Sequence, residues 1–574
     1  MRKALVACLV VVLALATPAG QTSPMTSDLG VPATGGVVVS ATEIASNIGA
    51  EILARGGNAV DAAVATAFAL AVTYPFAGNI GGGGFMVVRT PDGKATTFDY
   101  REKAPLTSTP TMYLNEKGEI NRSLTAAGYL APGVPGTVRG MALAHQRFGK
   151  LPWRDVVMPA VEIASNGFVM SASLARSLNG EIAGSMRAFP GSVDAYGRPD
   201  RAPWSIGDRF RQPDLARSLN AIGESPDAFY TGWIADRIAD DMAANGGLIS
   251  REDLAAYKAV ERAPIKGTFL GYEIISMPPP SSGGVALVEA LNILEALNIQ
   301  KTTRGSVESL HLVAEAMRRA FLDRARFLGD PDFVQVPVAK LTSKSHARDQ
   351  AKTISLTKAT SSVELGKDIV TVSLPSESDE TTHFSVLDRD GMAVSNTYTL
   401  EGGYGSHVVI KGTGILLNNE MGDFNKKPGT TNLTGDIGTP ANVIAPAKRM
   451  LSSMTPTIVT RNGRVVLVTG SPGGRTIINT ALNVVLNVTA WGMTGRQAVD
   501  APRSDHEWLP DRFNLEDGSA ADEVLAKLRA LGHVVRQSGR QGSAHSIWIG
   551  REGAFGINDR RDSTSKASPG SGGR

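Results

Sequence analysis

Cysteine is almost absent from this 574-residue chain, in which Cys8 is the only one. It lies in an N-terminal apolar run that we expect to be removed, so the mature protein has neither disulfide nor thiol chemistry. An excess of charge of one sign is also lacking, because 58 Lys and Arg residues stand against 55 Asp and Glu, a formal net charge of +3. This balance gives no reason to expect nucleic acid or an anionic membrane as a partner.

Apolar runs long enough to span a bilayer as a helix are lacking as well. The run 4–16 follows Arg2 and Lys3 and ends in small residues, which is the pattern of a cleaved secretory signal. We therefore expect a signal peptide over about residues 1–24 and export of the mature protein to the periplasm or the extracellular space. Cys8 stands at the front of the run rather than behind it, which argues against a lipid anchor.

Helix and strand patterns alternate along the rest of the chain, without a repeat or a long linker. The segment 35–43 is typical of a strand, and 311–329 has the apolar spacing of an amphipathic helix. Two sheets with helices on their outer faces account for this mixture. We expect one compact body that contains a polar, proline-bearing loop at 371–380 and ends in a disordered tail at 560–574.

The run TTHFSVLD (381–388), directly behind that polar loop, has the arrangement that a self-cleaving precursor needs. If the Glu380–Thr381 bond breaks, Thr381 carries a hydroxyl and a free α-amino group on one residue. Such an amine has an unperturbed pKa of about 7.7–8.0, which suits a general base beside a threonine nucleophile. Threonine also begins many ordinary strands, so this segment alone leaves both interpretations open.

A hairpin would bring a second hydroxyl to Thr381. The strand-like runs 381–388 and 392–400 flank Asp390-Gly391, which is a strong turn signal. Pairing about this turn places Thr399 opposite Thr381 or one residue away from it. The Thr399 hydroxyl could then fix the Thr381 rotamer and relay its proton, although threonine is common in strands in any case.

Two glycine-rich segments have different interpretations. Gly78 and Gly81–Gly84 are followed by a hairpin, whereas a dinucleotide-binding loop needs a strand before its glycines and a helix after them. Gly473 and Gly474 end a strand and precede a helix, where consecutive amides can point at a developing oxyanion. A plain tight turn before the helix is the alternative for this second pair.

Charged and hydroxyl residues elsewhere could hold a zwitterion. Arg101 ends a returning strand, where an arginine is either a solvated charge or a bidentate clamp on a carboxylate. Ser452 and Ser453 offer two neighbouring hydroxyl donors, and Glu420 and Asp423 are carboxylates that could receive an ammonium group. Each of them alone would also suit an exposed loop.

Ten short blocks, found in the family's order, resemble the γ-glutamyltransferases, also called glutathione hydrolases. They are AGNIGGGGF (77–85), FDYREKAP (98–105), GVPGTVRG (133–140), MPPPSSGGVAL (277–287), LGDPDF (328–333), TTHFSVLDRDGMAVSNTYTL (381–400), LLNNEMGDF (416–424), LSSMTPTIV (451–459), GSPGG (470–474) and APR (501–503). Ten blocks in one order are much more specific than any single block.

This resemblance implies an α+β fold, the four-layer αββα sandwich of the N-terminal-nucleophile hydrolases. It also implies that the precursor cuts itself between Glu380 and Thr381. A large chain, 25–380, and a small catalytic chain, 381–574, would then interleave in one body and stay associated as a heterodimer.

The resemblance also implies roles for individual residues. Thr381 would be the nucleophile, Thr399 its hydroxyl partner, and Gly473 and Gly474 the oxyanion hole. The α-carboxylate of the substrate would bind Arg101, Ser452 and Ser453, and its α-amino group would bind Glu401, Glu420 and Asp423.

Two features depart from the family pattern. Position 401 is Glu, where many members have Asn, although a carboxylate can still accept from an ammonium group. The segment 425–450 has the length of the family's active-site lid but contains no aromatic residue where some members place one. Access to the site and acceptor preference are therefore left open.

The implied reaction is acyl transfer from glutathione or related γ-glutamyl compounds, with no metal and no organic cofactor. Thr381 takes the γ-glutamyl group as an ester, and water or an amino acid or peptide acceptor removes it. One alternative is a glutaryl or cephalosporin-type acylase of the same fold, whose acyl group lacks the α-amino function. The other is an inactive exported binding protein. The carboxylates at 401, 420 and 423 favour glutamyl over glutaryl, and the intact Thr381/Thr399 pair argues against an inactive protein.

Overall fold

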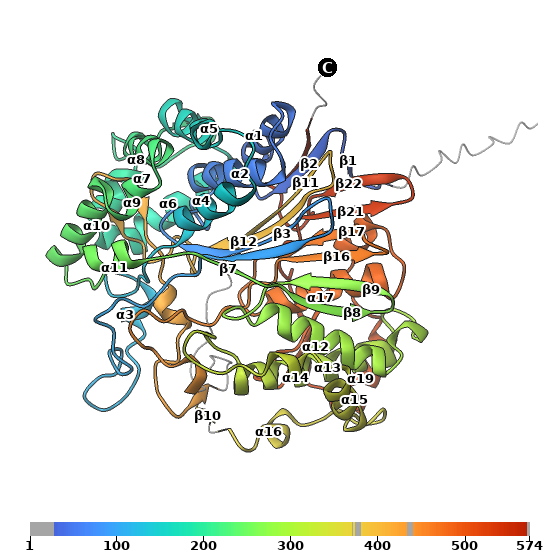
Figure 1. Ribbon diagram of the computed structural model, residues 1–574. Helices are drawn as coiled ribbons and strands as arrows, with labels where there is room; N and C mark the ends of the chain where they lie inside the picture. The colour runs from blue at the N-terminus through green and yellow to red at the C-terminus, as the bar shows by residue number, and fades with distance from the viewer. Residues whose placement is uncertain (1–27, 370, 373–379, 433–439, 571–574) are drawn as a thin grey trace, which may run out of the picture.

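The computed structural model describes residues 28–369, 371–372, 380–432 and 440–570, so the expected signal peptide lies outside the described residues. Two seven-stranded antiparallel sheets are stacked face to face, and helices cover both outer faces (Figure 1). These are the four layers of the α+β sandwich that the sequence predicts. No helix in these ranges is long and apolar enough to cross a membrane.

The first sheet contains the expected hairpin at its centre, as the pair β11–β12. In spatial order its strands are β23 (Lys566–Pro569), β2 (Gly36–Ser40), β11 (Thr382–Asp388), β12 (Ala393–Thr399), β3 (Gly83–Arg89), β4 (Ala95–Asp99) and β7 (Val260–Arg262). The glycines at 81–84 thus lead into the β3–β4 hairpin, as expected, and not into a helix.

The second sheet supplies the layer beneath the first. In spatial order its strands are β1 (Val31–Pro32), β22 (Gly553–Ile557), β21 (Ser546–Gly550), β17 (Arg464–Thr469), β16 (Thr457–Arg461), β9 (Tyr272–Ser276) and β8 (Ile265–Phe269). A smaller sheet consists of β18 (Ser504–Asp505), β19 (Phe513–Glu516) and β20 (Val535–Ser538).

Helices close the two outer faces. Against the first sheet pack α1 (Glu43–Ala54), α2 (Ala59–Thr73) and α4 (Thr137–Phe148), with α5 (Trp153–Asn166) behind α2. Against the second sheet pack α12 (Gly283–Ala296) and α17 (Thr476–Thr489), with α13 (Val307–Phe327) and α15 (Lys344–Lys352) on α12. The amphipathic helix expected at 311–329 is therefore confirmed as α13.

Local sequence explains where the first helices begin. Thr42 caps α1 by accepting from the Ala45 amide, and Asn58 and Asp61 form a capping box at the start of α2. All residues of α2 are buried, and most are Ala or Val, which lets this helix lie between β11 and α5. A helix that is apolar on all sides belongs in such an interior layer.

Strand alternation divides the core into layers. Val38 of β2 packs toward the helical side of its sheet, whereas Val37 and Val39 join the cluster between the two sheets. Leu387 of the first sheet and Ile458 of the second meet in this same cluster. Because successive side chains point to opposite faces, a strand that is covered on both faces is apolar throughout.

The segments before and after residue 381 interleave in both sheets. The first sheet takes β2, β3, β4 and β7 from the earlier segment and β11, β12 and β23 from the later one. The second takes β1, β8 and β9 from the earlier segment and β16, β17, β21 and β22 from the later one. Neither of the two seven-stranded sheets is therefore built from one segment alone.

The prediction of a disordered tail over 560–574 is wrong for residues 560–570. Within this stretch β23 pairs antiparallel with β2, and Ala567 and Ser568 are buried. The Ser46 hydroxyl donates to the Lys566 carbonyl at 2.8 Å, which ties the strand to α1. The ladder with β2 holds the strand, and Ala567 adds one small apolar side chain to the cluster between the sheets.

Candidate active site

Thr381 directly precedes β11, in the middle of the first sheet. In the β11–β12 ladder Thr382 faces Tyr398, so one further step of the same register brings Thr381 opposite Thr399. The Thr381–Thr399 register predicted from the Asp390-Gly391 turn is therefore confirmed. Both threonines are buried.

Two hydroxyls converge on one carbonyl oxygen at this point. Thr381 Oγ1 donates to the Glu380 oxygen at 2.7 Å, and Thr399 Oγ1 donates to the same oxygen at 2.9 Å. The Glu401 amide in turn donates to Thr399 Oγ1 at 2.9 Å, which directs the Thr399 proton toward Glu380. Glu401 has a φ of 79°, a left-handed conformation rare outside glycine that often marks functional sites.

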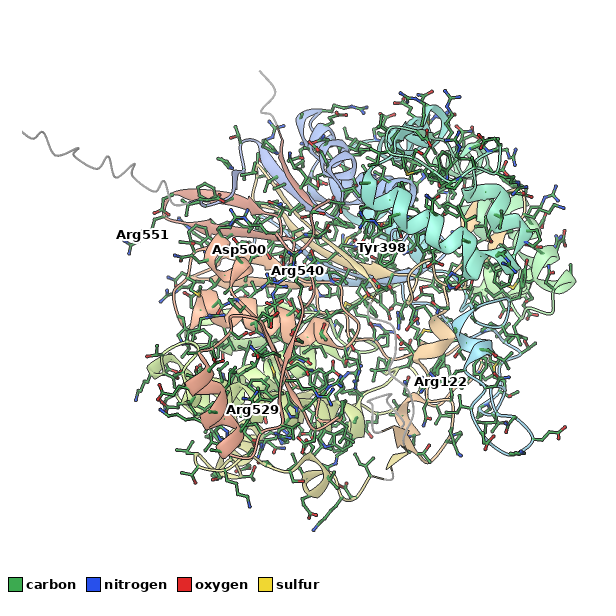
Figure 2. All side chains as sticks on the ribbon, turned by 180° about the vertical axis from the view of Figure 1, so that it is seen from behind. Arg122, Tyr398, Asp500, Arg529, Arg540 and Arg551 are labelled. Atoms are coloured by element: carbon green, nitrogen blue, oxygen red, sulfur yellow. The ribbon has the colours of Figure 1, made fainter. Side chains whose placement is uncertain are left out.

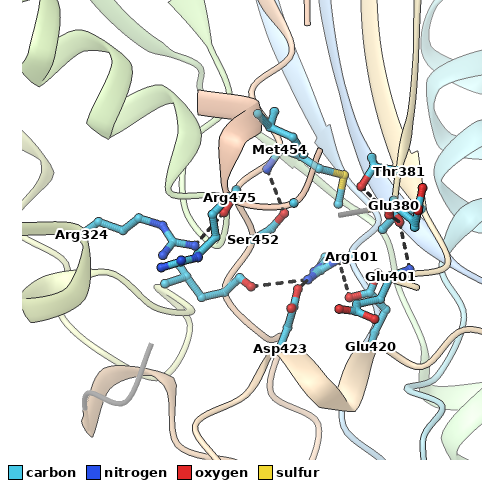
Figure 3. A pocket seen from close by; sticks show the side chains of 15 residues that line it. Arg101, Arg324, Glu380, Thr381, Glu401, Glu420, Asp423, Ser452, Met454 and Arg475 are labelled. Carbon is cyan, nitrogen blue, oxygen red and sulfur yellow. Dashed lines mark hydrogen bonds and ion pairs between the residues drawn. The ribbon is translucent and has the colours of Figure 1, made fainter. Parts of the chain in front are cut away.

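Arg101 follows β4 and is buried, with a side chain 1% exposed, so it is not a solvated strand-end charge. Its Nη1 lies 2.8 Å from Glu420 Oε2, and its Nη2 donates to Asp423 Oδ2 (Figure 3). Burial acts to lower the pKa of Arg101, but the carboxylates of Glu420, Asp423 and Glu102 outweigh it and raise that pKa. The arginine is a fixed cation held between carboxylates.

Glu420 begins the short 3₁₀ turn Glu420–Asp423 and is fully buried. Neither carboxylate oxygen accepts a hydrogen bond from the described residues, although Arg101 is close enough for an ion pair. Burial is the main cause that raises the pKa of Glu420 well above its usual value. Burial and then Asp423 raise the pKa of Glu401 to about 8. The Glu420 carboxyl lacks hydrogen-bond donors, which a bound ammonium group would supply.

Ser452 and Ser453 lie after the long loop that ends at 450. Ser452 Oγ accepts from the Met454 amide at 3.1 Å, and Ser453 Oγ accepts from Arg324 Nη2 at 2.7 Å. Both oxygens act as acceptors in these bonds, so each hydroxyl can donate its proton to a ligand. Arg324 Nε also donates to Ser282 at 2.7 Å, which fixes the guanidinium beside Ser453.

Gly473 and Gly474 lie between β17 and α17 with φ values of 127° and 52°. A side chain at Gly473 would bring its Cβ to 2.5 Å from Thr476 Oγ1, so both the conformation and the space require glycine there. The Gly473 carbonyl accepts from the Thr476 amide at 2.9 Å, whereas no hydrogen bond donated by either glycine amide is found within the described chain. Two amides at a helix start suit an anion.

The structure brings the predicted residues together. Lining one pocket are Arg101, Glu380, Thr381, Thr399, Glu401, Glu420, Asp423, Ser452, Ser453 and Gly474. Gly473 lines an adjoining pocket, which also contains Glu380 and Thr381. Figure 3 shows Thr381 on one side of the first pocket, with the Arg101–Asp423–Glu420 cluster below it.

Two arginines of the first pocket were missed by the sequence analysis. Arg324 comes from the buried face of α13, and Arg475 directly follows Gly474 and pairs with Glu507. An arginine at an apolar helical position is a usable signal, because a buried charge requires a partner. The sequence gives no comparable signal for Arg475.

Two buried clusters outside this pocket have metal-ligand chemistry: His311, Glu315 and His533, and Glu289, Asp323 and His346. Glu315 already pairs with Arg318 and Arg319, and His346 already binds Asp323 at 2.8 Å. Neither cluster contributes a residue to the Thr381 pocket.

The four-layer fold is that of the N-terminal-nucleophile hydrolases. The chain belongs to the gamma-glutamyltranspeptidase family, whose profile matches residues 45–568, and is an enzyme of that family. It is 46% identical over 528 residues to the glutathione hydrolase proenzyme of Escherichia coli (strain K12), covering 92% of this chain and 90% of that protein. It is 39% identical to the acylase ACY 1 proenzyme of Pseudomonas sp. (strain SE83), covering 91% and 92% of the two chains.

Solved structures show the same similarity. The cephalosporin acylase from Bacillus halodurans matches with a TM-score of 0.80 and 25% identity, covering 96% of this chain and 99% of that one. A chain of the Helicobacter pylori gamma-glutamyltranspeptidase matches with a TM-score of 0.56 and 42% identity, covering 57% of this chain and 94% of that one.

Proposed function

We propose that this chain is a self-processing γ-glutamyltransferase and glutathione hydrolase with Thr381 as its nucleophile. The observation that carries the proposal is that Thr381 shares one pocket with the buried cation Arg101 and the carboxyls of Glu401, Glu420 and Asp423. A γ-glutamyl donor is zwitterionic at the end far from its scissile amide. It therefore requires a cation and anions in one site, and the glutathione hydrolase relatives support the same activity.

In the donor complex, the substrate would replace contacts that the pocket residues make with one another. Its α-carboxylate would accept from Arg101 and from the hydroxyls of Ser452 and Ser453. Its α-ammonium would donate to Asp423 and to Glu420, whose oxygens otherwise lack donors. Because each new contact is charge-assisted, the γ-carboxamide is held in a fixed orientation relative to Thr381.

Self-processing would begin at the Glu380 carbonyl. Thr381 Oγ1 attacks the carbonyl carbon, while Thr399 donates to the carbonyl oxygen and stabilises its developing charge. The Glu380 acyl group moves from the Thr381 nitrogen to its oxygen, and that nitrogen takes up the hydroxyl proton. Water then cleaves the ester, leaving a carboxylate on Glu380 and a free amine on Thr381.

Turnover would use the same oxygen on a new carbonyl. The Thr381 amine takes the hydroxyl proton, and Oγ1 forms the γ-glutamyl ester. The Thr381 ammonium then gives this proton to the amide nitrogen, which leaves as an amine. The Gly473 and Gly474 amides would donate to the oxyanion that develops when the ester forms and again when it is cleaved. Water completes hydrolysis, and an amino acid or peptide amine completes transpeptidation.

The proposed cut between Glu380 and Thr381 defines the two subunits. Residues 25–380 would form the large subunit and 381–574 the small one, associated as a heterodimer. The segment 1–24 would direct export to the periplasm or the outside of the cell. N-terminal sequencing of the purified protein tests both statements, because the small fragment should begin TTHFSV and the large one should lack the apolar run 4–16.

The deciding experiment compares the turnover of glutathione, a γ-glutamyl anilide and a glutaryl anilide. The last differs from the γ-glutamyl anilide only by lacking the α-amino group. We expect glutathione and the γ-glutamyl anilide to be preferred, since the three carboxyls have no role with a glutaryl group. A glutaryl preference would instead assign the acylase function, which the similarity to a cephalosporin acylase keeps as the second candidate.

A variant at Thr381 tests the role of the nucleophile independently of the binding residues. Thr381→Ala should remain a single chain and turn over none of these substrates. Cleavage or turnover in this variant would remove Thr381 from its role.

A further inference from the structure

The adjoining pocket has a volume of about 580 Å³ and is lined by Thr381 but not by Arg101, Glu420 or Asp423. Glu380, Thr381 and Arg475 line both pockets. If the glutamyl end of a donor occupies the Arg101 side, the scissile nitrogen and the groups beyond it extend into the adjoining pocket. This location follows from the proposed function, and the chemistry of the wall then indicates which leaving groups fit.

The small sheet β18–β19–β20 forms one wall. Arg512 directly precedes β19, and Asn514, two residues later, lies on the same face because side chains alternate along a strand. β20 runs parallel to β19 and places Arg536 beside Asn514. Arg512, Asn514 and Arg536 all line the adjoining pocket, so this face presents two guanidinium groups to it.

The acidic residues of the adjoining pocket already have partners. Asp505 Oδ2 accepts from Asn514 at 2.8 Å, and Oδ1 accepts from Asn479. Glu507 pairs with Arg475, and Asp562 accepts from the Thr564 amide at 2.9 Å. Glu380 is the residue at which the chain is cut.

The guanidinium of Arg512, in contrast, has no hydrogen-bond or ion-pair partner in the part of the chain that the structure describes. Its Nε is buried, so water does not satisfy this donor either. Leaving a buried donor without an acceptor is energetically costly. An anion in this pocket could therefore bind the half-buried Arg512 without first breaking a bond between Arg512 and another residue.

We propose that Arg512 binds the carboxylate of the leaving group, and so selects donors and acceptors whose amine side ends in a free carboxylate. The cysteinylglycine part of glutathione is such a group. Two extended residues span at most about 7 Å, so its terminal carboxylate lies well beyond Thr381 but within a pocket of this size. An aromatic amine leaving group has no carboxylate for Arg512 to bind.

The test measures kcat/KM in wild type and in Arg512→Ala for three donors: glutathione, its glycine ethyl ester and a γ-glutamyl anilide. We expect the wild type to favour glutathione over the ester by about tenfold, the size of a charge-assisted hydrogen bond. Arg512→Ala should remove most of this preference by lowering kcat/KM for glutathione. Its kcat/KM for the anilide should stay within about twofold of the wild-type figure.

Arg529→Ala is the matched control, because it removes an exposed arginine of α19 (Asp522–Ala530) that does not line the pocket. Figure 2 shows Arg529 well apart from Arg540, which does line it. This variant should keep the wild-type preference. Arg512→Gln provides a second variant if the alanine protein is poorly folded, and anilide turnover reports on the integrity of each protein.

The outcomes are distinguishable. An unchanged glutathione-to-ester ratio in the Arg512 variants, an equal loss with the anilide, or the same loss in Arg529→Ala would overturn the assignment of Arg512. If the wild type turns over neither glutathione nor the anilide, the proposed function fails, and this inference fails with it. Normal anilide turnover together with an unchanged ratio refutes the Arg512 proposal alone.

Discussion

At the residue scale, the Glu380 carbonyl oxygen collects two hydroxyl donors from neighbouring strands. Thr399 is directed at it by the Glu401 amide, so its proton is already oriented before any reaction. We expect Thr399→Val, which keeps the shape but removes the hydroxyl, to slow self-cleavage by about a hundredfold to a thousandfold, as loss of one oxyanion donor does elsewhere. The fraction of uncut precursor on a denaturing gel over time measures this.

Thr399→Ser is the control for that experiment. It retains the hydroxyl and should cleave at a rate close to that of the wild type. If the valine variant matured as fast as the serine variant, the Thr399 bond to Glu380 would have no part in processing.

The pKa of Glu401 makes donor binding pH-dependent. Burial first, and Asp423 next, raise this pKa to about 8, so at lower pH the carboxyl is largely protonated and receives an ammonium group poorly. Ammonium binding then displaces a proton. We therefore expect KM for a γ-glutamyl anilide to fall as pH rises from about 6.5 to 8, by at most about tenfold per pH unit.

Glu401→Gln carries no charge at any pH, so its KM should vary much less over this interval. The comparison requires KM at a series of pH values in both proteins, with the glutaryl anilide as a donor that has no ammonium group. An identical pH dependence in the two proteins would show that another group is responsible.

At the element scale, the sequence predicts those helices and strands that local signals determine. The Asp390-Gly391 turn predicted the β11–β12 register, and the spacing at 311–329 predicted α13. The tail shows the limit of such signals. β23 contains too few apolar residues to be recognised, because its stability comes from backbone bonds to β2, which lies more than 500 residues earlier in the chain.

The β23 strand should contribute measurably to stability. Ending the chain after Asp562 removes its ladder with β2 and the bonds from Ser46, Thr564 and Ser568. At about 1 kcal/mol for each net hydrogen bond, loss of the three side-chain bonds alone should lower the free energy of unfolding by about 3 kcal/mol, and loss of the ladder should lower it further. Urea denaturation measures it, and a chain that ends after Gly570 keeps all these contacts and is the matched control.

At the scale of the whole molecule, the site is assembled from segments far apart in the chain. Arg101 comes from the earlier segment, whereas Thr381, Asp423 and Ser452 come from the later one. Their side-chain types were visible in the sequence, and the family resemblance grouped them. Neither source could show that Arg101 is already paired with Glu420 and Asp423, or that Arg324 fixes Ser453, because those contacts depend on three-dimensional packing.

Strands from before and after residue 381 pair with each other in both main sheets. If the proposed cut at Glu380 takes place, the pairs β11–β2, β12–β3 and β16–β9 would each join the two resulting chains. Separating them would expose the core between the sheets, at about 25 cal/mol for each Å² of apolar surface. We expect the two chains to co-elute on size exclusion at nanomolar concentration and to unfold in urea in one transition. Elution of the 381–574 chain alone in native buffer, or an early transition that releases it, would contradict this arrangement.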